Sequence, residues 1–444
     1  MHLRENMEIN DEGHLTIGGC DTVLLAETYG TPLYVVDEKL MRDRCRGYLA
    51  GFRRTYPNSR VIYAGKALLT TAICRIVEDE GLSLDVVSGG ELYTALTAGF
   101  PLERIYFHGN NKSLDELDMA LRVGVHRIVV DNLYELDMLS QMAMGRGVRA
   151  SVLLRLTPGV DAHTHSYMQT GQVDSKFGFG ISSGAALGAT REALSKPNID
   201  LKGFHCHIGS QIFDLGAFDA TGLVMFDFLE SARQELGFVA SELNLGGGLG
   251  IRYTSNDVRM EPAEYSSRLG ALIANEVKAR NYPEPLLLIE PGRSIVGEAG
   301  TTLYTVGASK EIPGVRTYMA VDGGMADNPR VALYQAEYEA VVANRASESP
   351  SRVVSVAGKC CESGDMLIWD LDVPEYRPGD ILAVFSTGAY NYSMASNYNR
   401  LPKPAMVLVC EGKSDLIVRR ETYEDLVRFD KIPARLERTR QAAC

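Results

Sequence analysis

Short runs of β-branched and aromatic residues alternate with longer segments of helical periodicity between residues 60 and 290. The eight runs occupy residues 60–64, 84–88, 104–108, 127–131, 151–156, 202–207, 242–246 and 286–290. The segments between them carry apolar residues three or four positions apart, as at Leu114, Leu117 and Leu121, which is typical of one buried helix face. Eight strand–helix repeats predict a (β/α)8 barrel, and an open doubly wound sheet is the structural alternative.

The pattern changes after residue 300, where apolar and polar residues alternate with a period of two. The clearest runs are residues 316–324, 351–358, 380–388 and 407–420. Such runs, separated by turn residues, predict a mostly antiparallel β domain. The early run 31–40 could pair with either part of the chain. We therefore expect an α/β protein with the barrel at 36–295 and a β domain made from 1–35 and 296–444.

The composition is that of an ordinary globular protein, with 45% apolar and 23% charged residues. A chain of 444 residues exceeds what one hydrophobic core usually serves, which also favours two domains. Neither an apolar run of about 18 residues nor the apolar core of a secretory signal is evident. The eight cysteines are scattered, and Cys360 and Cys361 lack the short spacing of a zinc site. These features predict a cytoplasmic protein with no membrane partner and no bound metal.

The net charge of −12 argues against a nucleic-acid partner, because phosphate contacts need clustered lysine and arginine. An anionic small substrate would need cations that are placed locally in its site.

The residues at or just after the eight predicted barrel strands are mostly polar. They are Lys66, Ser88, His108, Asp131, Arg155, His207, Gly246 and Glu290. Because the loops after barrel strands build the active sites of this fold, the sequence predicts an enzyme with its site at this end.

Lys66 lies among small and apolar residues in YAGKA. An amine in such a setting loses its charge more easily and can form a Schiff base with an aldehyde, although a lysine whose ammonium reaches water is the simpler reading of this segment alone. Gly246, Gly247 and Gly248 follow the seventh run, where backbone N–H groups of a barrel often bind phosphate.

Glu290 ends the last run, where a carboxylate can face the ring nitrogen of a pyridine cofactor. Arg293, in the same EPGR segment, is suited to bind phosphate or carboxylate. His205 and His207 share one face of a regular strand, so one could cover the cofactor ring while the other packs. Ser210 adds a hydroxyl suited to phosphate.

The predicted β domain carries a second group of candidate residues. Arg330 and Tyr334 follow a glycine turn, and Tyr390 follows a strand and a glycine. Cys361 and Glu362 stand in GKCCESGD, where an exposed cysteine could act as an acid, although free cysteines are more often buried and inert.

Taken together, the motifs resemble the diaminopimelate decarboxylase family, alanine-racemase-like (fold-type III) pyridoxal enzymes. The resemblance extends from residue 31 to 426, and the matching motifs occur in this order: YAGKA, DVVSGGEL, FHGNNKS, HCHIGSQ, GGGLG, EPGR, DGGMADNPRVALY, CESGD and GAYNYSMASNYNR. The resemblance implies pyridoxal 5'-phosphate as the cofactor and a homodimer with shared active sites. Many relatives have an asparagine after YAGKA, where this chain has leucine.

The resemblance also implies a role for each matching residue. Lys66 would bind the cofactor aldehyde, His207 would stack on the ring, Glu290 would meet the pyridine nitrogen, and Cys361 would donate a proton from the second subunit. The other cofactor-binding residues would be Asp85, Arg155, Ser210, Gly246, Gly247, Gly248, Gly292, Arg293 and Tyr390. The substrate-binding residues would be Arg293, Arg330, Tyr334, Glu362 and Tyr390.

The reaction implied is decarboxylation of meso-2,6-diaminopimelate to L-lysine and CO2, the last step of lysine biosynthesis. A decarboxylase for ornithine, arginine or carboxynorspermidine is the nearest alternative, and its substrates have less need for Arg330. An amino-acid racemase of the same fold is a further alternative, but a racemase gains from a weaker electron sink than Glu290 would supply.

Overall fold

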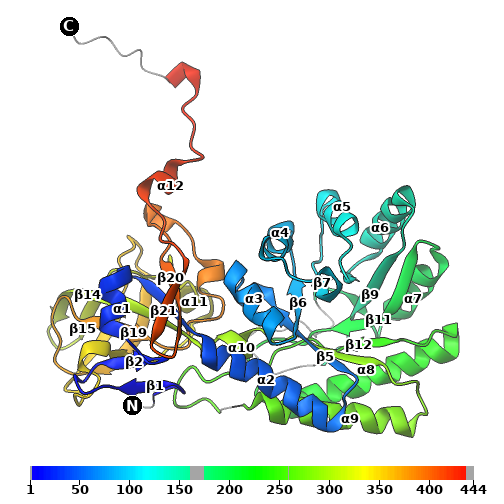
Figure 1. The fold of residues 1–444 in the computed structure, drawn as a ribbon, viewed down its shortest axis with the longest axis horizontal. Coiled ribbons are helices and arrows are strands. Elements are labelled where there is room, and N and C mark those ends of the chain that lie inside the picture. Colours follow the sequence, from blue (N-terminus) through cyan, green and yellow to red (C-terminus); the bar gives the residue numbers. More distant parts are fainter. Residues whose placement is uncertain (1–2, 161–174, 259, 437–444) are drawn as a thin grey trace.

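The computed structural model describes residues 3–160, 175–258 and 260–436, which form two lobes lying side by side (Figure 1). The first lobe is a parallel barrel that closes on itself, because the last strand pairs with the first. Its strands, in order around the ring, are β5 (Ser59–Ala64), β6 (Ser83–Val86), β7 (Ile105–Phe107), β8 (Arg127–Val130), β9 (Ala150–Thr157), β11 (Ile199–Cys206), β12 (Glu242–Asn244) and β13 (Leu286–Ile289). The predicted barrel is confirmed, and the open doubly wound sheet is excluded.

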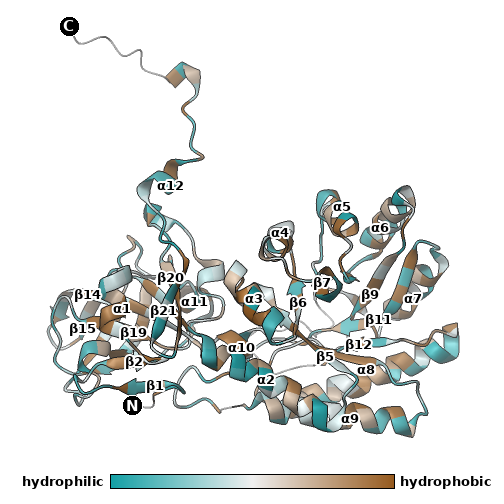
Figure 2. Ribbon diagram, in the orientation of Figure 1, coloured by the Kyte–Doolittle hydropathy of each residue, from teal (hydrophilic) through white to brown (hydrophobic). Residues whose placement is uncertain are grey.

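Helices cover the outside of the ring. They are α2 (Glu38–Thr55), α3 (Thr71–Asp79), α4 (Gly89–Ala98), α5 (Leu114–Val123), α6 (Leu133–Arg146), α7 (Ala185–Ser195), α8 (Leu215–Leu236) and α9 (Pro262–Ala279). Helix α2 precedes the first barrel strand, and each of the others follows a barrel strand. Brown and teal residues both occur on α8 and α9 in Figure 2, as expected for helices with one buried side. In α5, Leu117 is buried, whereas Leu114 at the first helical position is exposed.

The centre of the barrel is filled with side chains. Its cluster consists of Ile62, Tyr106, Val129, Leu153 and Leu288, each at most 1% exposed. A barrel packed in this way gives the loops at its carboxyl end a rigid floor.

The second lobe contains a nine-stranded sheet in which most neighbouring strands are antiparallel. Its strands are β4 (Leu33–Asp37), β14 (Gly300–Ile312), β15 (Arg316–Val321), β16 (Ala340–Val342), β17 (Arg352–Ala357), β18 (Met366–Val373), β19 (Ile381–Val384), β20 (Ala405–Cys410) and β21 (Lys413–Val418). The early run 31–40 pairs here, because β4 lies between β14 and β20. This strand crosses the boundary that the sequence placed after residue 35.

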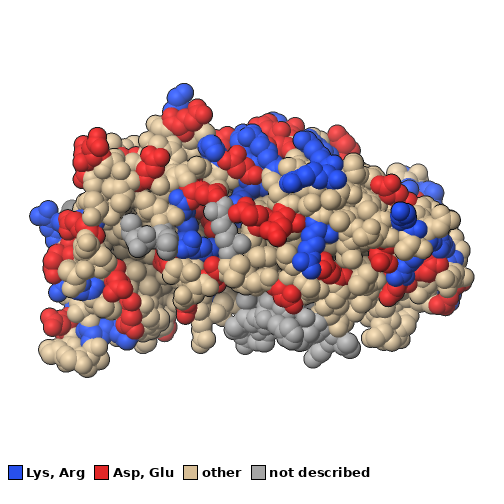
Figure 3. Space-filling view, turned by 90° about the horizontal axis from the view of Figure 1, so that it is seen from below, with Lys and Arg blue, Asp and Glu red and all other residues tan. Residues whose placement is uncertain are grey.

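Both ends of the described chain belong to the second lobe. A small sheet of β1 (Met7–Ile9), β2 (Leu15–Ile17) and β3 (Cys20–Asp21) precedes α1 (Thr22–Tyr29). At the other end, α12 (Tyr423–Val427) leads away from both lobes (Figure 1). None of the described helices has the length and apolar character needed to cross a bilayer. Acidic and basic side chains are intermixed over the face drawn in Figure 3.

Candidate active site

A cavity of about 460 Å³ opens at the carboxyl ends of the barrel strands, and the β domain closes one side of it. Twelve residues that the sequence singled out line this cavity: Lys66, Asp85, His108, Arg155, His205, His207, Ser210, Glu290, Arg293, Arg330, Tyr334 and Tyr390. Four of them are lysine or arginine, at positions 66, 155, 293 and 330, whereas among the described lining residues the carboxylates are Asp85 and Glu290. The cavity therefore concentrates positive charge in a chain whose net charge is −12.

Lys66 lies in a 3-10 turn, Gly65–Ala67, that directly follows β5. Its neighbours Ala64, Gly65, Ala67 and Leu68 are all buried, but Lys66 itself is exposed and lines the cavity. The apolar surroundings therefore fix the backbone of the turn and leave the amine accessible to a ligand. The sequence suggested that burial makes the Lys66 amine reactive. In the structure the residue is exposed.

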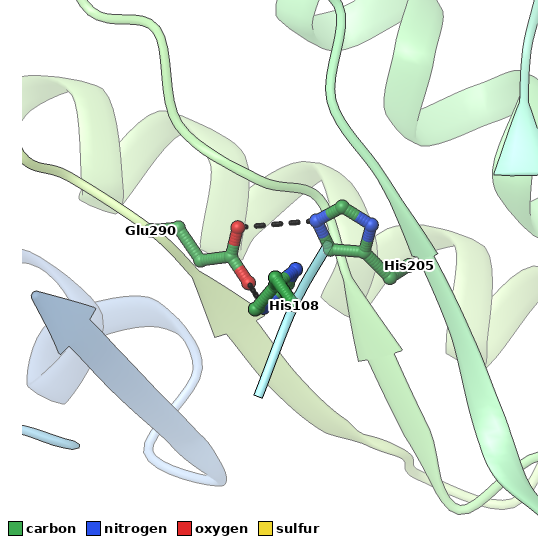
Figure 4. Close-up of side chains that lie close together, drawn as sticks. All are labelled: His108, His205 and Glu290. Carbon is green, nitrogen blue, oxygen red and sulfur yellow. Dashed lines mark hydrogen bonds and ion pairs between the residues drawn. The ribbon is translucent and has the colours of Figure 1, made fainter. Parts of the chain in front are cut away.

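Glu290, immediately after β13, is held by three side chains. His205 Nε2 lies 3.1 Å from Oε2, and His108 Nε2 lies 2.9 Å from Oε1 (Figure 4). Asn244 donates from Nδ2 to Oε1 at 2.7 Å. A carboxylate offers about four acceptor positions, so Oε2 keeps one for a ligand.

The histidines keep Glu290 ionised although it is only 8% exposed. Burial alone would raise the pKa of Glu290, but His108 and His205 hold it well below its usual range. Burial opposes protonation of His108, but Asp85 and Glu290 raise its pKa. Burial lowers the pKa of His205 to about 4, so this ring donates to Glu290 as a neutral imidazole. One ring nitrogen of His108, one of His205 and a carboxylate oxygen of Glu290 lie within 4.8 Å of one another. The sequence did not predict this cluster.

His207 lies one residue beyond β11 and lines the cavity. Burial, reinforced by the Lys66 charge, lowers its pKa well below the usual value. Gly247 donates its N–H to His207 Nδ1 at 3.3 Å, which places the ring proton on Nε2. The ring is thus a neutral group that can lie against a flat ligand.

The glycine run 246–248 packs among three strand ends and does not line the cavity. A Cβ on Gly247 would lie 2.1 Å from the Glu290 carbonyl oxygen, so no larger residue fits there. The Gly246 N–H is already bonded to Asn244 Oδ1, and that of Gly247 to His207. Among the described residues, the Gly248 N–H alone of the three has no acceptor. The sequence expected all three to be available to phosphate.

Arg293 begins α10 (Arg293–Val296) and is 6% exposed. Its Nε and Nη2 both donate to Ser210 Oγ, at 3.2 and 2.9 Å. Because that oxygen accepts twice from Arg293, the Ser210 hydroxyl proton is free to point at an anion. Gly292, just before, packs closely on the Lys66 turn: a Cβ there would lie 2.9 Å from Ala64 Cβ.

Arg330 begins α11 (Arg330–Tyr334) in the β domain and is 5% exposed. Its Nε donates to the Tyr338 hydroxyl at 3.0 Å. Tyr338 does not line the cavity, whereas Arg330 does. With Nε engaged behind it, the two terminal nitrogens of Arg330 form a fork that suits a carboxylate.

Tyr390 joins the two lobes at the site. Its N–H donates to the Ala67 carbonyl at 2.8 Å, and Ser393 Oγ donates to the same oxygen at 3.0 Å. The Arg293 guanidinium lies 4.7 Å from the centre of the Tyr390 ring. The turn that carries Lys66 is therefore fixed by the β domain.

Two other predicted residues take positions on the cavity wall. Arg155 Nε lies 3.8 Å from Asp131 Oδ1, and its guanidinium lies 4.2 Å from the Phe177 ring centre. Asp85 is 2% exposed, and burial raises its pKa. Its Oδ1 lies 3.8 Å from His108 Nε2.

Cys361 and Glu362 do not line the cavity of their own chain. Both are exposed, in a loop where Asn399 Oδ1 accepts the Cys361 N–H at 2.7 Å. Asp365, also in this loop, is buried and accepts the Cys360 N–H at 2.7 Å. The structure therefore shows an ordered loop that carries these two residues outward.

Sequence reasoning gave no role to several residues of the site. Val87, Gly109, Asn110, Phe177 and Met394 line the cavity, and Asn244 anchors Glu290 from the strand before it. His108 could have been found, because it was already recognised as a strand-end residue.

The fold and the site define a class of pyridoxal enzymes. Residues 43–297 match the family model described as "Pyridoxal-dependent decarboxylase, pyridoxal binding domain", a segment that covers the whole barrel.

Comparison with whole proteins narrows this class. The chain is 54% identical to a diaminopimelate decarboxylase of Bacillus subtilis (strain 168), over 97% of this chain and 98% of the relative. A crystal structure of the M. jannaschii diaminopimelate decarboxylase in co-complex with L-lysine superposes with a TM-score of 0.90 at 37% identity, covering 98% of this chain and 99% of that one. The Helicobacter pylori enzyme complexed with L-lysine gives 0.83 at 32% identity, covering 92% and 98%. The chain belongs to the diaminopimelate decarboxylase family.

Proposed function

We propose that this protein converts meso-2,6-diaminopimelate to L-lysine and CO2, with pyridoxal 5'-phosphate carried on Lys66. The observation that carries the proposal is that an accessible lysine amine and an ionised buried carboxylate, Glu290, line one cavity at the ends of the neighbouring strands β5 and β13. Membership of the diaminopimelate decarboxylase family supports the choice of substrate.

The donor set fits the proposed cofactor. When bound, the pyridoxal ring accepts the electron pair left by the broken bond between Cα and the carboxylate. Glu290 would hold a proton at the ring nitrogen through the free position on Oε2, and His205 and His108 keep that carboxylate fixed and charged. The neutral His207 ring would cover the pyridine face. Ser210 and Tyr390, which line the cavity, would hold the phosphate, and the Gly248 N–H, which packs against Gly209 beside the lining, would be a further donor.

The substrate would be held at its distal end by Arg330. Its terminal fork binds one carboxylate in bidentate fashion, and Tyr334 closes the same wall of the cavity. Arg293 supplies a second positive charge beside it. Both arginines thus suit the distal carboxylate, and the carboxylate on the carbon whose amine meets Lys66 would be the one that is lost.

The proton donor to Cα would be Cys361 of a second subunit, with Glu362 of the same loop binding the distal amine. Support for this comes from the loop's exposure and its distance from the cavity of its own chain. A homodimer with shared sites would bring these residues to a cavity that lacks an acid of this kind among its described lining residues. A cytoplasmic location, and the division into a barrel at 36–295 and a β domain of 1–35 plus 296–444, belong to the same proposal.

The alternatives make different demands on the site. Ornithine, arginine and carboxynorspermidine lack the distal amino-acid head that Arg330 suits. A racemase would gain little from an ionised Glu290, which makes the ring a strong electron sink.

The direct test is to incubate the purified, cofactor-loaded protein with each candidate substrate and to measure CO2 and product. We expect CO2 and L-lysine in equal amounts from meso-diaminopimelate, and little CO2 from L-ornithine, L-arginine or carboxynorspermidine. Faster release from one of those three, or racemisation without CO2, would refute the proposal.

A further inference from the structure

Arg293 and Arg330 are both buried at the cavity, yet neither forms an ion pair with a carboxylate among the described residues. Their polar partners are hydroxyl groups: Ser210 and Tyr253 for Arg293, and Tyr338 for Arg330. Burying a charge without a counter-charge is costly. Arg293 and Arg330 are only 6% and 5% exposed, so other groups must stabilise their guanidiniums in place of a carboxylate.

Tyr253 lies between the two guanidiniums. Arg293 donates from Nη1 to its hydroxyl, and the centre of its ring lies 5.7 Å from the Arg293 guanidinium carbon and 5.4 Å from that of Arg330. The faces of aromatic rings attract cations without neutralising them. One tyrosine thus contacts both positive groups.

Tyr338 completes the support from behind. Its hydroxyl accepts from Arg330 Nε, and its ring meets the Tyr253 ring edge to face, with centroids 5.4 Å apart. Tyr253 is fixed through its backbone as well, since Arg4 Nη2 donates to its carbonyl oxygen at 2.7 Å and Asp257 accepts its N–H at 2.9 Å. Neither tyrosine lines the cavity, so both act on the ligand through the arginines.

We propose that Tyr253 and Tyr338 are positioning residues that hold Arg293 and Arg330 in place while leaving both charges uncompensated, and that this pair sets the preference of the site for a dicarboxylate. An acidic residue in place of Tyr253 or Tyr338 would also hold an arginine, but its negative charge would cancel the positive charge that the ligand needs. A phenol fixes the side chain and accepts a hydrogen bond, and it leaves the positive charge to the ligand. This inference rests on the proposed function for the identity of the substrate.

Tyr253→Phe and Tyr338→Phe test the proposal independently, because each removes one hydroxyl and keeps the ring. A hydrogen bond to a charged group is strong enough that KM for meso-diaminopimelate should rise about tenfold in each variant. The value of kcat should stay within about threefold, because the reacting atoms are untouched. Tyr282→Phe is the matched control: Tyr282 is also buried and accepts the Ala240 N–H at 2.9 Å, away from the cavity.

Two probe ligands separate charge recognition from general disruption of the site. Heptanedioate has two carboxylates and no amine, whereas pentane-1,5-diamine has two amines and no carboxylate. In calorimetric titrations of the holoenzyme, both tyrosine variants should bind heptanedioate about tenfold more weakly than wild type and should bind pentane-1,5-diamine as wild type does.

Equal weakening of both probes, or unchanged heptanedioate binding in both variants with normal cofactor absorbance, overturns the proposal. These binding results do not depend on turnover. If wild-type protein released no CO2 from diaminopimelate, the proposed function would fail while the titrations still decided the role of the tyrosines.

Discussion

His108 Nε2 lies 2.9 Å from Glu290 Oε1, and this contact crosses the mouth of the barrel (Figure 4). His108 follows β7 and Glu290 follows β13, strands that are not neighbours in the ring. His205 holds the other carboxylate oxygen from β11. Three strand ends thus converge on one carboxylate and fix both its orientation and its charge.

Glu290→Gln should lower kcat/KM at least about 100-fold, because removing one well-placed electrostatic partner of a developing charge typically has an effect of this size. The amide keeps the shape of the side chain but cannot hold a proton at a ring nitrogen. Steady-state CO2 release measures the change, with cofactor absorbance as the check on occupancy. Asp200→Asn is the matched control, since Asp200 pairs with Lys202 at the start of β11 and does not line the cavity. Activity near that of wild type in Glu290→Gln would contradict the assigned role.

Arg330→Ala should raise KM for meso-diaminopimelate about 100-fold, because the fork that binds the distal carboxylate is lost. The KM of Arg330→Lys should lie between those of Arg330→Ala and wild type, since an ammonium keeps the charge but not the bidentate geometry. Initial rates over a range of substrate concentrations separate KM from kcat. If KM were unchanged in Arg330→Ala, the distal carboxylate would be bound elsewhere.

The contribution of Cys361 from a second subunit can be tested by mixing two inactive proteins. Lys66→Ala and Cys361→Ala each lack one essential group, so a mixed dimer has one complete site and one doubly defective site. With free subunit exchange, the mixture should reach about a quarter of wild-type activity, as random pairing in a two-fold dimer requires. If the mixed proteins form dimers of the same mass as wild type but stay as inactive as each protein alone, Cys361 acts in its own chain. The double variant mixed with either single variant should remain inactive.

The barrel was predictable because the signal for each strand is local. Runs such as 60–64 and 127–131 are short and rich in β-branched residues, and all eight predicted runs became strands. The β domain was harder, because β14 and β16 are defined by their pairing with β19, a strand distant in sequence from both. Strands that depend on such long-range pairing have only a weak local sequence pattern.

The sequence allowed the residues of the candidate site to be identified, but it did not allow the contacts between them to be predicted. Lys66, Glu290 and Arg330 were found because each lies within a recognisable motif. The exposure of Lys66, the engagement of the Gly246 and Gly247 N–H groups, and the support from Tyr253 depend on side-chain directions across the cavity. Those directions are set by tertiary packing, which no single stretch of sequence specifies.

His126 gives a prediction about stability and pH. Burial, followed by the charges of Arg127 and Arg60, lowers its pKa from 6.5 to about 3. The unfolded chain therefore takes up a proton near pH 6.5 that the folded chain refuses, so stability from this group is present above that pH and is lost as the pH falls toward 3. His126→Gln should lose less thermal stability between pH 7.5 and pH 5 than wild type, as scanning calorimetry of both proteins can show. An equal loss in the two proteins would rule out this role for His126.

Lys66 is the residue on which the whole assignment depends, and trapping the cofactor on it is the most direct test. Reduction of the purified holoenzyme with borohydride, followed by peptide mass spectrometry, should place a phosphopyridoxyl group on the peptide that contains Lys66 and on no other lysine. The visible absorbance of the bound cofactor should disappear at the same time, and Lys66→Arg should show neither signal. Attachment to another lysine, or no attachment in folded wild-type protein that has been supplied with the cofactor, would contradict the account.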